Sequence, residues 1–152
     1  MKWPKLSTLC DKGTHLWVAW RTSLGPSNDA PEFAPLVREG AQAIRWYRIL
    51  ADKAYDSEAH HTLCRVELKI PRTLIPVQSR GTRRWPQTTY RRQMKRRFHR
   101  HAYHQRWQAE SAFSRHKRRL GSALRAHSAP GRNAELALRV LTHNLMLLTE
   151  AA

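Results

Sequence analysis

The sequence predicts a mixed α/β domain in which a sheet is flanked by helices. Its 152 residues are enough for one domain with a real core and too few for two of ordinary size. Alternating apolar and polar residues, typical of strands, open the chain, and helical periodicity follows between further short apolar runs. The resulting order is strand, strand, helix, strand, helix, strand, helix, helix. Such an order favours a three-layer α/β arrangement.

The N-terminal part predicts a hairpin followed by a helix. "KLSTLC" and "LWVAWRT" alternate, and "DKGTH" between them has the composition of a turn, so the first 21 residues form two antiparallel strands. Gly25 and Pro26 end the second strand. Asn28 or Asp29 then caps a helix. Its apolar residues are Phe33, Leu36 and Val37.

The middle of the chain predicts two more strands around a helix. Residues 45–52, "RWYRILAD", are a short apolar run that ends in an acid, which is typical of a buried strand that delivers Asp52 to a sheet edge. Residues 57–68 form a helix with Asp56 or Ser57 as its N-cap. "TLIPVQ", residues 73–78, is the last predicted strand.

The C-terminal part predicts two helices. A basic loop over residues 79–89 leads into one long helix, roughly residues 90–120, that stops near Gly121. "SAPGRN" is then a linker, and residues 134–150 form an amphipathic helix. Its predicted core-facing residues are Leu136, Val140, Leu141, Leu145 and Leu148. Trp17 and Trp107 are expected in packing, and His116 on the basic surface.

A formal net charge of +17 indicates a polyanionic partner, with nucleic acid as the first choice. An anionic membrane is the alternative, but the sequence has no apolar run of 18 residues and no signal-peptide hydrophobic region. We therefore expect a cytoplasmic protein. Cys10 and Cys64 lack the spacing of a zinc framework and are expected as reduced thiols.

Glu110 is the only acid among fifteen Lys and Arg between Arg80 and Arg125, which suggests a specific role such as binding a metal ion. On one continuous helix, Tyr103, Arg106, Glu110 and Lys117 would share a face about 60° wide. A carboxylate there can hold Mg²⁺, and the flanking cations can bind phosphates. One carboxylate does not hold two metal ions, so a second acid is needed. Asp52 is the leading candidate because, unlike Asp56, it has no capping role to explain it.

Simpler explanations exist for each of these residues. Glu110 can be a surface acid paired with Arg106 one turn back, and Asp52 can be a turn residue. The run "RRQMKRRFHR" can be a solvated helix face, although its charge density favours phosphate contacts by Arg96 and Arg97. Trp85, beside Pro86 in the basic loop, is a further candidate for stacking on a base.

The ordered set Tyr103, Arg106, Glu110 and Lys117 resembles the Y-R-E-K signature of bacterial insertion-sequence transposases of the DDE type. "LADKAYDSE" is similar to the strand segment that carries the second acid of that family. "WPKLSTLCDKGTHL" resembles the hairpin after its first acid, and "LTHNLM" its closing helix. The resemblance thus extends over nearly the whole chain.

This resemblance implies an RNase H-like α/β fold, truncated at the N-terminus, with a two-metal site for Mg²⁺ or Mn²⁺. Asp52 would be the second acid and Glu110 the third, and both would be catalytic and metal-binding. Tyr103, Arg106 and Lys117 would contact and position double-stranded DNA at transposon ends. The implied activity is metal-dependent phosphodiester cleavage and strand transfer in DNA transposition, and the implied location is the bacterial nucleoid.

The first acid of the family lies on a strand before the hairpin with which this chain opens. Asp11 is the obvious substitute, but the turn chemistry of "CDKGTH" places it at a hairpin tip. We therefore expect a single partial catalytic domain over residues 1–152, with little cleavage by the isolated chain. The alternative is a non-catalytic basic DNA-binding remnant that pairs with or regulates a full-length transposase. An RNA-binding protein ranks last.

Overall fold

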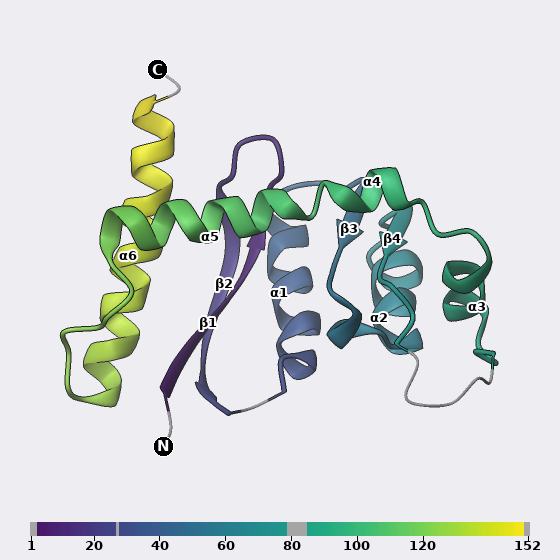
Figure 1. The fold of residues 1–152 in the computed structure, drawn as a ribbon, viewed down its shortest axis with the longest axis horizontal. Helices are drawn as coiled ribbons and strands as arrows, with labels where there is room; N and C mark the ends of the chain where they lie inside the picture. Colours follow the sequence, from purple (N-terminus) through teal and green to yellow (C-terminus); the bar gives the residue numbers. More distant parts are fainter. Residues whose placement is uncertain (1–2, 27, 79–84, 151–152) are drawn as a thin grey trace. The chain divides into compact units, whose positions relative to one another are not determined.

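The computed structural model describes residues 3–26, 28–78 and 85–150. These residues divide into two compact units (Figure 1). Unit 1 contains residues 1–28 and 107–152, and unit 2 contains residues 29–106. Each unit is described by itself below.

Unit 1 begins with the predicted hairpin. β1 (Trp3–Cys10) pairs with β2 (Trp17–Gly25) in an antiparallel ladder that runs from Trp3 opposite Gly25 to Cys10 opposite Trp17. Asp11 lies in the turn, where its carboxylate accepts hydrogen bonds from the Thr14 N–H at 2.9 Å and the Thr14 hydroxyl at 2.8 Å. The hairpin, the turn and the strand end at Gly25 are confirmed.

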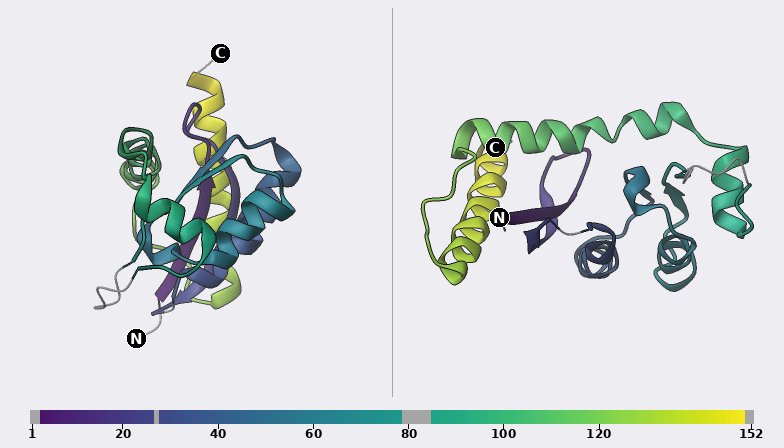
Figure 2. Two further views of the ribbon diagram at one scale, coloured as in Figure 1. Left: turned by 90° about the vertical axis from the view of Figure 1, so that its right-hand side faces the viewer. Right: turned by 60° about the horizontal axis from the view of Figure 1, so that its bottom comes forward.

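α5 (Trp107–Leu120) and α6 (Ala129–Glu150) complete unit 1 and cross each other beside the hairpin (Figures 1 and 2). The core forms around Trp17, which is 2% exposed and packs with Ala112 and Val140. The Asn144 amide accepts from the Trp17 N–H at 2.9 Å and donates to the Trp17 carbonyl at 3.0 Å, which fixes α6 to the start of β2.

The buried face of α6 differs from the prediction. Its buried residues are Leu136, Val140, His143 and Leu147. Leu141, Leu145 and Leu148 are 55%, 51% and 53% exposed, so their assignment to the core was wrong. Leucines lie on several sides of α6, so their periodicity does not decide which face of the helix is buried. The packing of His143 against Trp17 decides it.

The start of α6 was also misplaced. The segment predicted as a linker is the first turn of the helix, because the Ser128 hydroxyl accepts from the Gly131 N–H at 3.1 Å as an N-cap does. Pro130 is tolerated there since the first helical N–H groups have no partner inside the helix.

Unit 2 contains α1 (Ala30–Ala43), β3 (Arg48–Leu50), η1 (Lys53–Tyr55), α2 (Glu58–Thr62), η2 (Leu63–Glu67), β4 (Arg72–Leu74), α3 (Thr89–Arg96) and α4 (Arg100–His104). β3 and β4 pair in parallel, and α1 and α2 lie on one face of the pair (Figure 2). The α1 core residues are the predicted Phe33, Leu36 and Val37, together with Gly40. A strand before Asp52 is confirmed, although β3 and β4 are both shorter than predicted and only Ile49 of β3 is buried.

The predicted long helix over residues 90–120 is wrong, because three helices occupy this segment: α3, α4 and α5. The first break lies at residues 97–99 and the second at Gln105 and Arg106. Like charges at i and i+4 destabilise a helix, and here no acid offsets them before Glu110. α5 does end as predicted, at Gly121 with a φ of +78°.

The fold is therefore a mixed α/β one with helices and small sheets. β1–β2 and β3–β4 belong to different units, so the single mixed sheet and the RNase H-like arrangement remain predictions.

Candidate functional site

Asp52 lies directly after β3 and Ala51, at the surface of unit 2. Its side chain is 45% exposed. The Asp52 Oδ1 atom accepts from the Ala54 N–H at 3.1 Å, so the residue caps η1. The prediction that Asp52 has no capping role was wrong, because a 3₁₀ turn too short to show a periodic pattern follows it.

Arg106 and Tyr103 lie beside Asp52 in the same unit. The Arg106 Nη1 atom is 4.0 Å from the Asp52 Oδ2 atom. The Arg106 guanidinium also lies over the Tyr103 ring, 5.9 Å from its centroid. An ion pair this exposed contributes little to stability, so its effect is to place a cation next to the carboxylate. Sequence reasoning named these three residues but did not anticipate that Arg106 would pair with Asp52.

Glu110 and Lys117 lie on α5 in unit 1. They are seven positions apart, so they share a face of the helix, and both are exposed. They border a shallow open hollow. The other residues that line it are Phe113, Ser114, Arg118 and Ser122. The expectation that Tyr103, Arg106, Glu110 and Lys117 share one helix was wrong: Tyr103 belongs to α4, and Arg106 follows it in a turn.

The two predicted metal ligands belong to different units, Asp52 to unit 2 and Glu110 to unit 1. Their convergence on one ion stays a prediction. Within the described residues no group of three or more His, Cys, Asp or Glu is placed to hold a metal ion. Carboxylate oxygens are the donors that Mg²⁺ and Mn²⁺ prefer, and both side chains are accessible, so Asp52 and Glu110 fit such an ion in chemistry and exposure.

Asp11 is occupied by its turn. Burial acts to raise its pKa, but the hydrogen bonds from Thr14 outweigh burial and hold the pKa below its usual range. Asp11 thus lies in the hairpin turn, as the composition of this segment predicts.

Asp56 or Ser57 was predicted as the N-cap of the helix after it; Ser57 occupies that position before α2, and Asp56 instead binds Arg91. The Asp56 side chain is 1% exposed, and both its oxygens accept from the guanidinium, at 2.9 Å and 2.8 Å. Glu58 accepts the backbone N–H groups of Tyr90 at 2.9 Å and Arg91 at 3.1 Å at the start of α3. Burial acts to raise the pKa of Glu58, but these hydrogen bonds outweigh it and hold the pKa below its usual value. Arg91 is thus a structural residue, and no local sequence signal reveals it.

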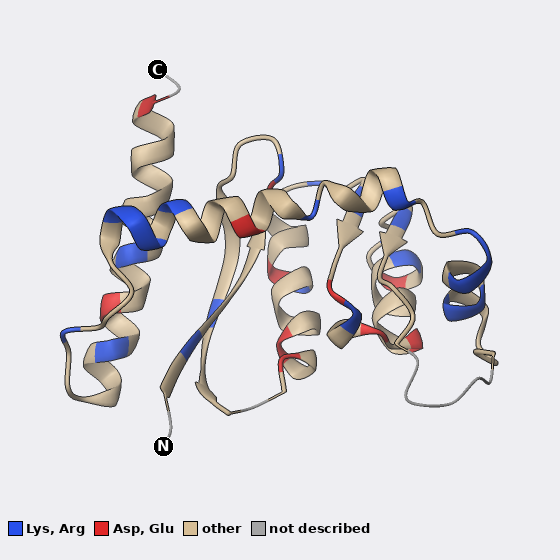
Figure 3. Ribbon diagram, in the orientation of Figure 1, with Lys and Arg blue, Asp and Glu red and all other residues tan. Residues whose placement is uncertain are grey.

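Lys and Arg are dense in the sequences of α3 and of the C-terminal half of α5, and others are distributed over both units (Figure 3). Arg96 and Arg97 are exposed at the end of α3. His116 was expected among the surface cations but is only 5% exposed and lies 4.8 Å from Trp17, ring centre to ring centre. Trp107, expected in packing, is 54% exposed. Cys10 and Cys64 are both free thiols.

Comparison with protein families gives a match to the transposase DDE domain over residues 2–145. The chain belongs to the transposase DDE domain family. No curated protein and no solved structure matches it.

Family membership establishes a transposase-type function, with DNA as the substrate that the family suggests. Transposase DDE domains generally use divalent metal ions, which agrees with the carboxylate chemistry of Asp52 and Glu110. No helix among the described residues is both long and apolar enough to cross a lipid bilayer.

Proposed function

We propose that this transposase DDE domain cleaves and joins DNA of an insertion sequence, and that Asp52 and Glu110 are two of its metal-binding acids. The observation that carries the proposal is the grouping of Asp52, Tyr103 and Arg106 in unit 2. These residues come from segments about fifty positions apart: Tyr103 and Arg106 belong to the set that resembles the family signature, and Asp52 to the segment that resembles the strand of the family's second acid.

The division of roles follows from the chemistry of the side chains. Asp52 and Glu110 would hold Mg²⁺ or Mn²⁺, and such ions supply activation of the attacking hydroxyl and stabilisation of the leaving oxygen. Arg106, next to Asp52, would stabilise negative charge on the phosphate that is transferred. Tyr103 would restrict Arg106 through its ring face. Lys117, exposed near Glu110, would bind a neighbouring phosphate, as would Arg96 and Arg97 on α3.

Only two acids of the site are assigned, and Asp11 is engaged by Thr14. We therefore expect residues 1–152 to bind DNA and to cleave it poorly without a further carboxylate. Strong Mg²⁺-dependent nicking by this polypeptide alone would contradict this expectation.

A second candidate function is a non-catalytic DNA-binding regulator of a full-length transposase. It is favoured by the Asp52 contacts, because the bond to Ala54 and the proximity of Arg106 account for this carboxylate without a metal ion.

DNA affinity with and without Mn²⁺ separates the two functions. If the proposal is right, Mn²⁺ strengthens DNA binding by the wild type, and the variant Asp52→Asn with Glu110→Gln loses this effect while keeping its metal-free affinity. Glu67→Gln, which removes an exposed carboxylate paired with Arg38, is the control and should respond to Mn²⁺ as the wild type does. An identical Mn²⁺ response in wild type and double variant would favour the regulator.

A further inference from the structure

Unit 1 contains a second hollow, separate in its lining from the surface of unit 2 that carries Asp52. It has a volume of about 640 Å³, within the range of ligand-binding pockets. Its walls come from β1, α5, the loop between α5 and α6, and α6. It shares Phe113, Lys117 and Ser122 with the hollow beside Glu110.

The lining combines apolar surface with positive charge. Leu6, Phe113 and Leu136 contribute apolar surface, and Lys117, His127 and Arg132 contribute cationic or polar nitrogen. None of the described residues that line the hollow is acidic. The Lys117 ammonium forms no ion pair with a described residue, so it is available to a ligand. A ligand that suits this lining has a flat apolar part and a negative part.

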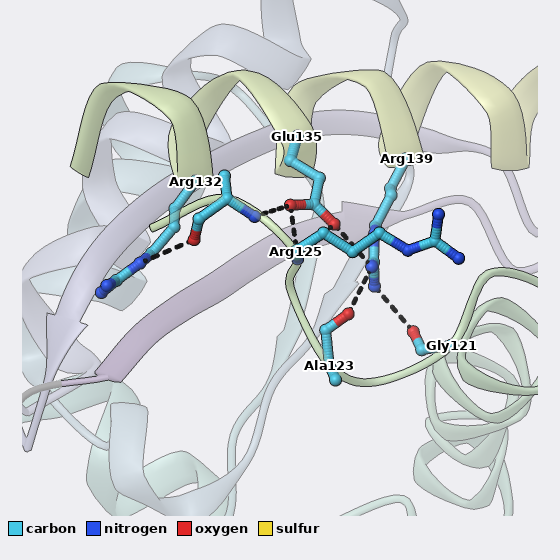
Figure 4. A network of polar contacts seen from close by, with 7 residues as sticks. Gly121, Ala123, Arg125, Arg132, Glu135 and Arg139 are labelled. Carbon is cyan, nitrogen blue, oxygen red and sulfur yellow. Dashed lines mark hydrogen bonds and ion pairs between the residues drawn. The ribbon is translucent and has the colours of Figure 1, made fainter. Parts of the chain in front are cut away.

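The loop that forms one wall is held in place by α6 (Figure 4). Arg139 donates to the carbonyls of Gly121 at 2.8 Å and Ala123 at 2.5 Å. Glu135 accepts the N–H groups of Arg125 and Ala126, each at 2.9 Å. Arg132 donates to the His127 carbonyl at 2.6 Å. These bonds fix the wall before any ligand arrives, which lowers the entropy that binding costs. They also occupy Arg139, which leaves Lys117 as the main cation for a ligand.

Trp3 provides an aromatic surface at the edge of the hollow. It is 52% exposed and lies opposite Gly25 in the hairpin ladder. A Cβ atom added at Gly25 would lie 2.6 Å from the Trp3 ring, so only glycine lets the indole lie against the backbone there. The ring is therefore supported on one face and available on the other. A nucleobase stacks favourably on such a ring.

We propose that this hollow binds an unpaired nucleotide of DNA, with its base on Trp3 and the apolar wall and its phosphate near Lys117. The inference rests on the proposed function in that the ligand is DNA, and it assigns to unit 1 a site for a nucleotide outside the duplex. The surface shared with the Glu110 hollow would bring this nucleotide next to the proposed catalytic acid on the same helix.

The test uses three DNA duplexes of the same sequence, compared by fluorescence anisotropy at one salt concentration. One is fully paired, the second has a single-nucleotide bulge, and the third has the same bulge without its base. The proposal predicts that the wild type binds the base-containing bulge roughly tenfold more tightly than the abasic bulge, the effect expected for one stacked base.

Two variants and one control assign the preference to the hollow. Trp3→Ala should remove it, and Gly25→Ala should weaken it by displacing the Trp3 ring while every aromatic side chain is kept. Trp85→Ala is the comparison, because Trp85 is 53% exposed in unit 2 and is the other tryptophan proposed for base stacking; if the nucleotide binds in the hollow, this variant keeps the preference. Thermal unfolding checks each variant, and Trp3→Ala decides alone if Gly25→Ala does not fold.

The outcomes separate this inference from the proposed function. Duplex binding without any preference for the base-containing bulge overturns the nucleotide site and leaves the proposed function standing. A preference that Trp85→Ala removes and Trp3→Ala keeps also overturns the site. A wild type that binds none of the three duplexes overturns both.

Discussion

Asp52 and Asp56 are four residues apart and occupy opposite environments. The Asp52 side chain is 45% exposed with a cation 4.0 Å away, whereas the Asp56 side chain is 1% exposed and accepts two hydrogen bonds from Arg91. Sequence reasoning offered Asp56 or Ser57 as the cap of the helix that follows and gave Asp52 no cap. In the structure, Asp52 caps η1 and Asp56 forms a buried ion pair with Arg91. Local sequence patterns do not predict this pair, because Arg91 lies 35 residues further along the chain.

Replacing each residue by asparagine should lower the free energy of unfolding by a different amount. Asp56→Asn weakens two charge-assisted hydrogen bonds to Arg91, whose side chain is 27% exposed, and should lower the free energy of unfolding by about 2 to 3 kcal/mol. Asp52→Asn disturbs only an exposed pair and a short cap and should cost less than about 1 kcal/mol. Urea denaturation measures both. Equal losses would contradict the difference in burial.

The buried histidines make stability depend on pH. Burial, and then the nearby His143 and Arg139, lower the pKa of His116 to about 4, and burial lowers the pKa of His61 in unit 2 to about 4. Both rings are therefore neutral in the fold, whereas unfolded histidine has a pKa of about 6.5. The unfolded chain binds more protons between these values, so stability is complete above pH ~6.5 and falls as the pH drops towards 4.

The melting temperature measured between pH 7 and pH 5 checks this expectation. It should fall over this interval, and His116→Phe should make the fall smaller, with His61 still contributing. His104→Gln, at an exposed position, is the control and should leave the pH profile unchanged. A wild-type melting temperature that is constant over this interval would show that neither ring is buried in its neutral form.

At the scale of elements, the sequence predicted the local features well. The hairpin, α1, β3 and the end of α5 follow from alternation, from Gly25 and Pro26, and from Gly121, all of which act on the backbone within a few residues. The choice of the buried face of α6 could not be predicted, because it depends on a contact between distant residues. The break-up of residues 90–120 into three helices was missed for another reason: helical periodicity takes no account of repulsion between like charges at i and i+4.

The orientation of α6 can be tested with two neighbouring leucines. Leu147 is 7% exposed and Leu145 is 51% exposed. Leu147→Ala should cost about 2 to 5 kcal/mol of unfolding free energy, and Leu145→Ala should cost less than about 1 kcal/mol. Chemical denaturation of the two variants gives the comparison. A larger loss for Leu145→Ala than for Leu147→Ala would mean that the opposite face of α6 is buried in unit 1.

At the scale of the whole molecule, the net charge of +17 should dominate DNA affinity. Each phosphate contact releases counterions, so the logarithm of the binding constant falls linearly with the logarithm of salt concentration. Replacing Arg96 and Arg97 together by glutamine should reduce this slope by about 2. Arg38→Gln is the control, because Arg38 pairs with Glu67 at 2.7 Å, and it should leave the slope nearly unchanged. If Arg38→Gln and the Arg96/Arg97 variant changed the slope equally for each charge removed, total charge and not these two residues would determine DNA affinity.

The candidate site was predictable only in part at this scale. Residue types and their order suggested Asp52, Tyr103, Arg106, Glu110 and Lys117, whose roles stay a prediction, and the family match over residues 2–145 agrees with the transposase assignment. The placement of Asp52 relative to Glu110 depends on how unit 1 and unit 2 meet, and no local pattern in the sequence encodes that.

Mn²⁺ binding in a double-mutant cycle tests the shared site most directly. Mn²⁺ is titrated by electron paramagnetic resonance into the wild type, Asp52→Asn, Glu110→Gln and the double variant, each with duplex DNA. If both carboxylates hold the same ions, each single variant loses nearly as much affinity as the double variant, because neither acid binds well alone. Two results would contradict a site built by Asp52 and Glu110 together: losses of Mn²⁺ affinity that add in the double variant, or the same Mn²⁺ affinity in all four proteins.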